Sequence, residues 1–243
     1  MAYKQVIPYK DKKNKKKIQV RMMFNRISSN YDLLNRLISG GIDVLWRKKV
    51  VSLLIPEKPK KVLDIATGTG DLAIELIKTN ANEIIGVDSS EGMREIGVKK
   101  VKNRKFNHKI KMEIGDGEKL SYPDNYFDAA TVAFGVRNFE NRNKGLREIL
   151  RILKPQGSLF VLEFSQPDTW FRPFYFLYLK YILPCIAGII SKDKNAYQYL
   201  AGTIESFPSK ELLKSQLFEA GYSEVKALGM TFSTVAIHHA IKD

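Results

Sequence analysis

Residues 61–71 read KVLDIATGTGD, and a second apolar run, EIIGVD, ends at Asp88. The first run, followed by Gly68 and Gly70, is typical of a buried parallel strand that turns sharply into a helix. Glycine permits the positive φ that such a turn requires and allows a ligand to approach the backbone closely. An acid at the end of the next strand can accept hydrogen bonds from a ribose diol. The two runs therefore predict a site for a nucleoside-containing cofactor.

Two cofactors fit this turn, and a tight turn without any ligand would carry the same glycines. Residues 68–73, GTGDLA, match the loose dinucleotide pattern G-x-G-x-x-G/A, so NAD is one of the two. Asp64 on the strand and Asp71 at the helix start would oppose a pyrophosphate, which binds there through backbone N–H groups and the helix dipole. Asp64 could instead hold an amino-acid ammonium group or a water bound to it. These acids favour the cationic sulfonium of S-adenosylmethionine.

A third acid ends the next predicted strand. Residues 109–116, KIKMEIGD, alternate apolar and polar side chains, and Gly117 follows. Asp116 could accept a hydrogen bond from the exocyclic amine of adenine, although a simple turn residue would also explain it. Three strand-end acids in successive βα units (Asp64, Asp88 and Asp116) strengthen the prediction of a nucleoside site.

The length and composition suit one α/β domain. The chain has 243 residues, 44% of them hydrophobic, which is enough for a packed core. Its single cysteine, Cys185, excludes an internal disulfide, fits a reducing compartment and lies in an apolar run typical of a buried thiol. The histidines have no metal-ligand spacing with it, so we predict no metal site. No apolar signal-peptide core is present, and we therefore expect a cytoplasmic protein.

The net charge of +14 is concentrated near the N-terminus, where residues 1–26 carry nine Lys or Arg and one Asp. We predict a basic, flexible tail over 1–17, ahead of a domain over 18–243. A solvated tail is the simplest interpretation, and an anionic membrane surface or nucleic acid are the alternatives. No nucleic-acid motif is readable, so we expect no nucleic acid as a partner.

Strand-like and helical stretches alternate regularly from residue 61, which predicts βαβ units in a parallel sheet. A lid of two helices over 18–55 precedes them, with a break at Gly40-Gly41. The predicted strands are 61–65, 83–88, 110–114, 127–134 and 158–164, with helices over 142–153 and 211–220 and two final β-rich runs over 223–229 and 232–241.

An aromatic segment within 166–208 interrupts this alternation, with seven aromatic residues between 170 and 181. A membrane-spanning helix needs about 20 apolar residues, and here Arg172 and Lys180 intervene. The segment either packs wholly on the core or forms a partly exposed surface that meets a lipophilic substrate or a bilayer.

With these motifs placed, the chain resembles the class I S-adenosylmethionine-dependent methyltransferases over 18–240. More narrowly, it resembles the demethylmenaquinone/ubiquinone-biosynthesis C-methyltransferase family. The glycine loop is shared widely, whereas YDLLNRLISGG (31–41), FGVRN (134–138), LREILRILKPQG (146–157) and LEFSQP (162–167) are more specific. The segment NAYQYLA (195–201) also matches.

The resemblance implies a single Rossmann-like doubly wound sheet of seven strands whose last strand is antiparallel. It implies transfer of a methyl group from S-adenosylmethionine to a ring carbon of a prenylated quinol. Demethylmenaquinol is the first choice and the benzoquinol of ubiquinone biosynthesis the alternative. Another lipid, RNA, or a role as an inactive cofactor-binding scaffold also stays open. Contact with an anionic membrane at its inner face and a homodimer are compatible with the sequence.

Candidate site residues follow partly from this resemblance, which implies Thr69, Asp88, Asp116, Gly117 and the position of Ala133, and partly from their place in the predicted sheet, lid and aromatic segment. Arg137 and Asn138 follow the fourth strand at the edge where ligands bind in such sheets, and they are the predicted catalytic residues. Arg137 stays protonated, so it would stabilise a phenolate or orient a water that accepts the proton; a salt bridge with Glu140 or Asp116 is the alternative. Asn138 could hold the ring hydroxyl. The predicted cofactor contacts are Asp64, Gly68, Thr69, Gly70, Asp88, Ser89, Asp116, Gly117 and, through its backbone only, Ala133; the predicted substrate contacts are Tyr31, Tyr197 and Tyr199.

Overall fold

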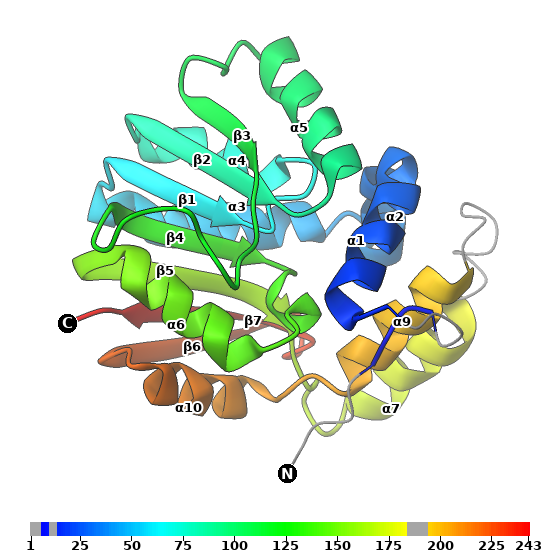
Figure 1. Cartoon of the computed structure of the whole chain (residues 1–243). Coiled ribbons are helices and arrows are strands. Elements are labelled where there is room, and N and C mark those ends of the chain that lie inside the picture. The colour runs from blue at the N-terminus through cyan, green and yellow to red at the C-terminus, as the bar shows by residue number, and fades with distance from the viewer. Residues whose placement is uncertain (1–5, 10–13, 184–193) are drawn as a thin grey trace.

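The computed structural model describes residues 6–9, 14–183 and 194–243, so Cys185 lies outside the described residues. Its centre is one seven-stranded sheet in the order β3-β2-β1-β4-β5-β7-β6 (Figure 1). The pairs among the first five strands are parallel, whereas β7 is antiparallel to both β5 and β6. This confirms the predicted doubly wound sheet with an antiparallel last strand. The strands are β1 (Lys61–Ile65), β2 (Glu83–Asp88), β3 (Ile110–Ile114), β4 (Phe127–Ala133), β5 (Leu153–Phe164), β6 (Glu224–Met230) and β7 (Val235–Ile241).

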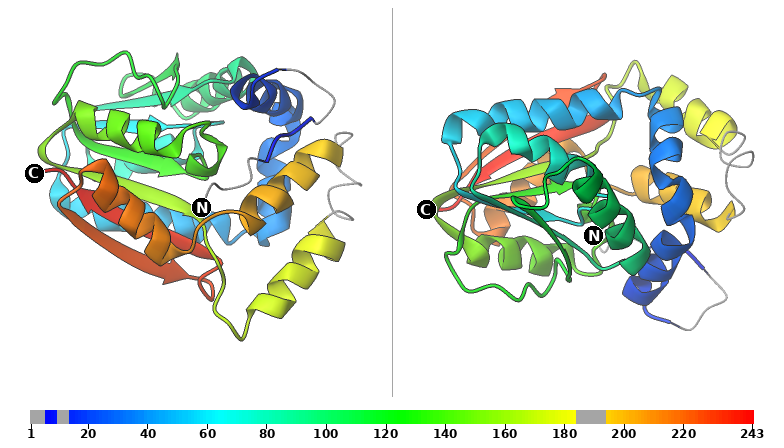
Figure 2. Two further views of the ribbon diagram at one scale, coloured as in Figure 1. Left: turned by 60° about the horizontal axis from the view of Figure 1, so that its bottom comes forward. Right: turned by 90° about the horizontal axis from the view of Figure 1, so that it is seen from above.

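Helices cover both faces of the sheet because the parallel strands are apolar on both sides (Figure 2). One face is covered by α3 (Asp43–Leu54), α4 (Asp71–Glu75) and α5 (Glu91–Asn103), and the other by α6 (Arg142–Ile152) and α10 (Lys210–Ala220). Neighbouring residues of β1 divide between the two cores, with Val62 in the first and Leu63 in the second. The two cores hold the sheet rigid, and its carboxyl edge carries the loops described below.

The segment 18–55 forms three helices, so the prediction of two was wrong. α1 (Lys16–Ile27) and α2 (Tyr31–Ser39) are separated by a short 3₁₀ turn over 28–30, and α3 follows. Gly40, with a φ of 59°, ends α2 as predicted. Only α1 and α2 lie over the carboxyl edge as a lid (Figures 1 and 2). α3 packs against the sheet instead, where Val50 and Leu54 are fully buried.

The aromatic segment lies beside the lid at the same edge (Figure 2). It contains α7 (Arg172–Leu177), a π-helical turn over 178–182, and α9 (Lys194–Glu205). The Tyr178 hydroxyl donates a hydrogen bond to the carbonyl oxygen of Ile38 in α2, at 2.6 Å. Across the ranges that the structure describes, no helix is both long and apolar enough to cross a bilayer.

Part of the segment predicted as a tail over 1–17 packs on the domain. Tyr9 is buried with Val20 and Met23 of α1 and Tyr197 of α9, and α1 already begins at Lys16. The basic segment therefore reaches the carboxyl edge, where two of its lysines contact the candidate site.

Candidate active site

Two turns with unusual backbone conformations form the floor of the site. Ala66 after β1 and Phe134 after β4 have φ values of 53° and 57°, although neither is glycine. Such values are rare for a bulky residue and concentrate at functional sites. The two turns are in contact, because a Cβ on Gly135 would lie 2.6 Å from the Cβ of Ala66. Glycine at 135 is therefore required for the two turns to pack.

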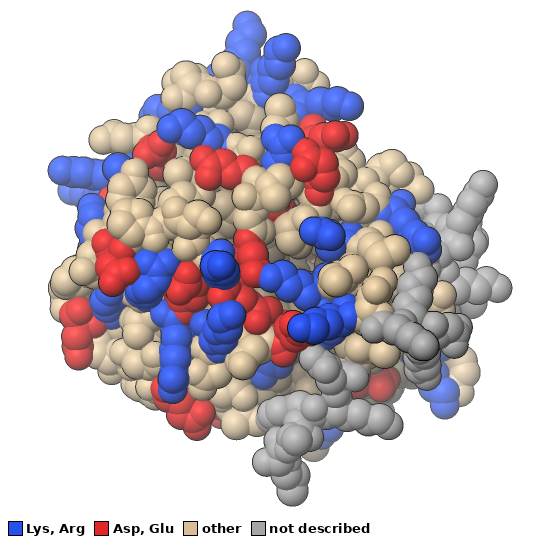
Figure 3. Space-filling view, in the orientation of Figure 1, with Lys and Arg blue, Asp and Glu red and all other residues tan. Residues whose placement is uncertain are grey.

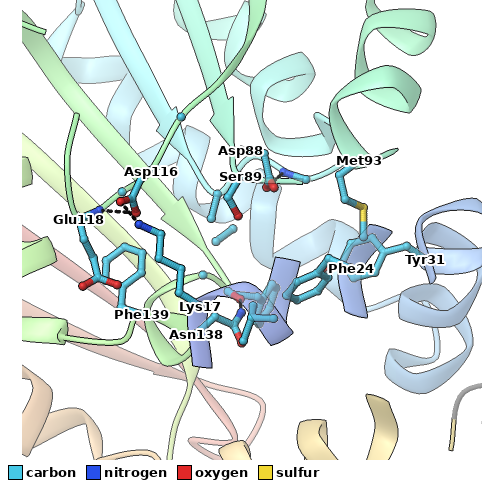
Figure 4. A pocket seen from close by; sticks show the side chains of 18 residues that line it. Lys17, Phe24, Tyr31, Asp88, Ser89, Met93, Asp116, Glu118, Asn138 and Phe139 are labelled. Atoms are coloured by element: carbon cyan, nitrogen blue, oxygen red, sulfur yellow. Dashed lines mark hydrogen bonds and ion pairs between the residues drawn. The ribbon is translucent and has the colours of Figure 1, made fainter. Parts of the chain in front are cut away.

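A cavity opens above these turns, between the strand ends and α1 (Figure 4). Asp88, Ser89 and Asp116 project into it from the ends of β2 and β3. Gly117 lets the loop pass close to β1, because a Cβ there would lie 2.9 Å from Cγ2 of Ile65. The cavity brings together the predicted residues Tyr31, Gly68, Asp88, Ser89, Asp116, Gly117, Ala133 and Asn138, and its apolar walls include Val20, Phe24, Met93 and Phe139.

Asp88 is held by backbone donors. One carboxylate oxygen accepts a hydrogen bond from the Gly68 N–H and the other from the Ser90 N–H, both at 2.8 Å. Burial raises the pKa of Asp88, and these backbone hydrogen bonds oppose the rise. Each oxygen keeps a second lone pair, so the carboxylate can still accept from a ribose diol.

Asp116 is paired with a lysine of the lid. The Lys17 ammonium reaches from α1 to this carboxylate (Figure 4), and both side chains are partly exposed. Asp116 also accepts a hydrogen bond from the Glu118 N–H at 3.1 Å. If adenine uses Asp116 as predicted, its amino group and Lys17 compete for the same carboxylate.

We therefore expect Lys17→Met to tighten S-adenosylmethionine binding by up to about fivefold, because an exposed ion pair is worth at most about 1 kcal/mol. Titration calorimetry would measure the dissociation constant. Lys48→Met, at an exposed position of α3, is the matched control and should leave it unchanged. Weaker binding by the Lys17 variant would instead mean that Lys17 contacts the cofactor.

Asp64, Thr69 and Gly70 lie outside this cavity. Asp64 is buried behind the loop, where its two oxygens accept hydrogen bonds from the Thr67 and Thr131 hydroxyls at 2.6 and 2.7 Å. Thr69 donates to Asp32 of α2 at 2.5 Å, and Gly70 caps α4 with a φ of 80°. These residues shape the loop and fasten the lid.

Asp71 also faces the lid. Its carboxylate pairs with Arg36 at 2.7 Å, with Lys100 at 2.5 Å and with Arg47 at 3.4 Å. These cations lower its pKa against the opposing effect of burial. Three cations thus neutralise the charge of Asp71. This charge therefore opposes a phosphate ligand less strongly than the sequence alone indicated.

Burial raises the pKa of Asp64 to about 6. The Asp64 carboxyl therefore binds a proton more tightly in the folded chain than in the unfolded chain. Its contribution to the free energy of unfolding is complete below about pH 4 and is lost as the pH rises to about 6. Asparagine does not ionise, so the free energy of unfolding of Asp64→Asn should rise relative to that of the wild type by up to about 3 kcal/mol between these pH values. Urea unfolding at pH 4.5 and 7 would measure this change, and an equal difference at both pH values would contradict it.

A second, mainly apolar cavity adjoins the first. It lies between α2, the aromatic segment and the end of β5, and Tyr31 and Phe134 line both cavities. It has two buried cations, Arg137 and Arg47. Arg47 is paired with the buried carboxylate of Asp43, whereas Arg137 lies close to the rings of Phe164 and Phe134. Its other walls include Ile38, Trp46, Tyr175, Tyr178, Leu179, Leu183, Leu200 and Ile204.

Arg137 pairs with Glu163, which we did not predict, rather than with Glu140 or Asp116. The Nη1 to Oε1 distance is 2.7 Å. Glu163 is the one acid in the strand SLFVLEF (158–164), and this signal could have identified it. Lys16 is a second unpredicted residue: its ammonium donates to the carbonyl oxygens of Arg137 and Phe139 at 3.2 and 2.9 Å, and burial lowers its pKa to about 8.

The other predicted substrate contacts surround the same place. Tyr199 of α9 donates to the side-chain oxygen of Asn138 at 3.1 Å, and Asn138 donates to the carbonyl oxygen of Phe134 at 3.3 Å. Burial raises the pKa values of Tyr31 and Tyr199, so both hydroxyls stay protonated and can donate. Tyr197 lines a smaller adjoining cavity with Tyr31 and Asn138.

The residues of the first cavity fit S-adenosylmethionine. Its two acids offer acceptors of the kind that a ribose diol and an adenine amine need, its apolar side chains can cover a purine, and its glycines admit close approach. The sheet order and this site together define the class of S-adenosylmethionine-dependent methyltransferases.

The chain belongs to the ubiE/COQ5 methyltransferase family, whose model matches residues 10–242. It is 42% identical to the demethylmenaquinone methyltransferase of Bacteroides fragilis, over 94% of each chain. It is 40% identical to the ubiquinone/menaquinone biosynthesis C-methyltransferase UbiE of Geobacter sulfurreducens, over 90% of this chain and 87% of that protein.

Solved structures share the fold at low sequence identity. A SAM-dependent methyltransferase from Aquifex aeolicus is 18% identical, with a TM-score of 0.63 over 87% of this chain and 98% of that one. The cyclase SpnF is also 18% identical, with a TM-score of 0.66 over 92% of this chain and 95% of that one. A methyltransferase and a cyclase thus share this architecture, so the substrate must be argued from the site.

Proposed function

We propose that this enzyme transfers the methyl group of S-adenosylmethionine to a ring carbon of a prenylated quinol, with demethylmenaquinol as the preferred substrate. The observation that carries the proposal is the contact between two unlike cavities. A polar one holds Asp88 and Asp116, an apolar one holds Arg137, and Tyr31 and Phe134 line both. A nucleoside and a lipophilic ring can therefore meet where the two cavities adjoin. The names of the relatives support the choice of a menaquinone precursor.

The polar cavity would hold the cofactor, whose sulfonium supplies an electrophilic methyl group. Asp88 would accept hydrogen bonds from the ribose hydroxyls, and Asp116 would accept one from the adenine amine. Ser89 lies beside Asp88, and Gly117 leaves room for the ligand. These contacts fix the position of the nucleoside, and alignment of this kind can supply several kcal/mol of a reaction barrier.

The apolar cavity would hold the quinol. Loss of the proton from a ring hydroxyl makes the neighbouring ring carbon nucleophilic, so the enzyme must stabilise the resulting oxyanion. Arg137 is a buried cation that cannot lose its own proton at ordinary pH. It would stabilise the oxyanion directly or through a water that accepts the proton. Tyr31, which lines both cavities, and Asn138, which lines the polar one, would supply further donors.

The proposal is tested with the purified enzyme, S-adenosylmethionine carrying a deuterated methyl group, and a reduced naphthoquinol with a short prenyl chain. Mass spectrometry should find the label on a ring carbon. A benzoquinol compared under the same conditions decides between the two ring systems. In the organism, a strain without this gene should accumulate a quinone one methyl group lighter; unchanged quinones in that strain would refute the proposal.

We further propose that the aromatic segment meets the membrane from which the quinol comes. Trp170, Phe174, Leu177 and Tyr181 recur at helical spacing and are each more than half exposed. The opposite side of the same segment lines the apolar cavity. Between residues 170 and 183 the charged side chains are Arg172 and Lys180, both cations. An apolar face with basic residues suits the interface of an anionic bilayer.

Vesicles of phosphatidylglycerol and phosphatidylcholine at low salt should bind the wild-type protein. Phe174→Glu should weaken this binding about tenfold or more, because burying a phenylalanine is worth about 1.5–3 kcal/mol. Phe218→Glu is the matched control, since Phe218 lies on α10 and is 44% exposed against 62% for Phe174. Equal losses in both variants, or no wild-type binding, would contradict this role.

RNA is the other substrate class that the charge of +14 suggested. On the face shown in Figure 3, Lys and Arg are interspersed with Asp and Glu rather than gathered into one basic patch. Nucleic-acid binding depends on such a patch. This face therefore offers no such patch, and the names of the relatives favour the quinol.

A further inference from the structure

Glu163 is a buried acid for which the proposed reaction has so far given no role. It lies near the end of β5 and is 1% exposed. Burying a carboxylate is costly unless it is paired and hydrogen-bonded. Glu163 is paired with Arg137 at 2.7 Å, and it accepts hydrogen bonds from the backbone N–H groups of Arg137 at 3.2 Å and Phe164 at 2.9 Å. It is thus fixed by the backbone and by the side chain of the candidate catalytic arginine.

The hydrogen bonds of Arg137 fall on one side of its guanidinium. Nη1 donates to Glu163 and, at 2.5 Å, to the carbonyl oxygen of Phe134. Nε is buried and has no hydrogen-bond partner in the described part of the chain. A guanidinium offers five N–H donors in a rigid plane, so fixing Nη1 also fixes the direction of the edge formed by Nε and Nη2.

A ligand would satisfy this free edge. The Arg137 side chain is 7% exposed and lines the apolar cavity. An unpaired buried donor in such surroundings is unfavourable, whereas the ring oxygen of a bound quinol would accept from it. Resting on the proposed function, we propose that Glu163 is a positioning residue, which aims the Nε/Nη2 edge of Arg137 at the substrate oxygen that becomes the phenolate.

The charge of Glu163 gives this role a distinct signature. A negative charge near the substrate hydroxyl disfavours its ionisation, so Glu163→Gln should lower the pH at which the bound substrate ionises. The expected shift of the acid limb of the kcat profile is about one pH unit, as expected for charges several ångströms apart at a partly buried site. The same variant should lower kcat about tenfold or more, because a neutral amide holds Arg137 less firmly and its edge meets the substrate oxygen less often in the reactive geometry. This misalignment opposes the change in ionisation, but the lost negative charge is the larger effect on the substrate pKa. Glu163→Asp keeps the charge and should keep the wild-type pH profile at a reduced kcat.

The experiment measures kcat and KM from pH 5 to 9 for the wild type and both variants, with S-adenosylmethionine and a short-chain naphthoquinol. Thermal unfolding and cofactor titration check that each variant folds and binds the cofactor as the wild type does. A kcat that falls with no change in the pH profile of Glu163→Gln would show a purely structural role and overturn the inference. An unchanged kcat would also overturn it.

A binding measurement separates this inference from the proposed function. The colour of 4-nitro-1-naphthol reports whether the bound ring hydroxyl is ionised, and no methyl transfer is needed. Its apparent pKa in the complex should be lower with Glu163→Gln than with the wild type. The same apparent pKa in both proteins, or no binding by the wild type, would overturn the inference. If the shift is seen but no quinol is methylated, the proposed substrate fails and the positioning role stands.

Discussion

Arg137→Ala is expected to lower kcat for quinol methylation about 10²–10³-fold, the usual cost of removing a donor that stabilises a developing oxyanion. The dissociation constant of S-adenosylmethionine should change little, because the Arg137 side chain lines the apolar cavity rather than the one that holds Asp88. Methyl transfer from labelled S-adenosylmethionine gives kcat, and calorimetry gives the affinity. Loss of cofactor binding in a folded variant would contradict the assigned role.

Arg137→Ala could also destabilise the fold, because it leaves the buried carboxylate of Glu163 without its cation. Breaking such a pair costs about 3–5 kcal/mol of stability. Arg137→Lys keeps a positive charge for Glu163 but lacks the planar fork of donors. It should remain folded, bind the cofactor and still lose most of the turnover. Full activity in the lysine variant would show that charge alone suffices at this position.

Asp88→Ala should have the opposite pattern and raise the dissociation constant of S-adenosylmethionine about 10²–10⁴-fold. The estimate assumes two hydrogen bonds from ribose hydroxyls to a charged acceptor, worth about 1.5–3 kcal/mol each. Asp88→Asn keeps the size of the side chain and one acceptor oxygen, and its loss should be smaller. Calorimetric titration of both variants would measure these affinities.

The matched control is Asp124→Ala, which removes an exposed aspartate that pairs with Arg151. It should bind the cofactor as tightly as the wild type. Because Asp88 also holds the N–H groups of Gly68 and Ser90, thermal unfolding must accompany the titration. If Asp88→Ala stays folded and binds normally, the assigned ribose contact is wrong.

The sheet could be predicted because its signals are local. Apolar runs of strand length, ended by acids or glycines, gave the bounds of β1, β2 and β3 as the structure has them. The start of β5 was missed, because Lys154 to Gly157 stop α6 as predicted but continue as strand from Leu153, with a register shift against β4. The break between α1 and α2 was missed because Ser28 to Asn30 contain neither Gly nor Pro.

The sequence could predict which site residues lie at the carboxyl edge of the sheet, but not where their side chains point. Strand-end position identified Asp88 and Asp116, because the carboxyl ends of parallel strands meet at one edge. It could not tell that Asp64 and Asp71 turn away from the cavity, since side-chain direction depends on the loop geometry. Glu163 stands out as the one acid of its strand, but its pairing with Arg137 could not be predicted, because the two residues are distant in sequence and meet only when β4 and β5 pair.

Tyr31 and Phe134 have a consequence for how the two ligands reach the site, because each residue borders both cavities. A sulfonium nucleoside dissolves in water, and a prenylated quinol dissolves in lipid. In the proposed reaction the two compounds meet beside these two residues, so neither has to enter the solvent of the other. The protein then works as a partition between two phases, and in each turnover a single methyl group crosses it.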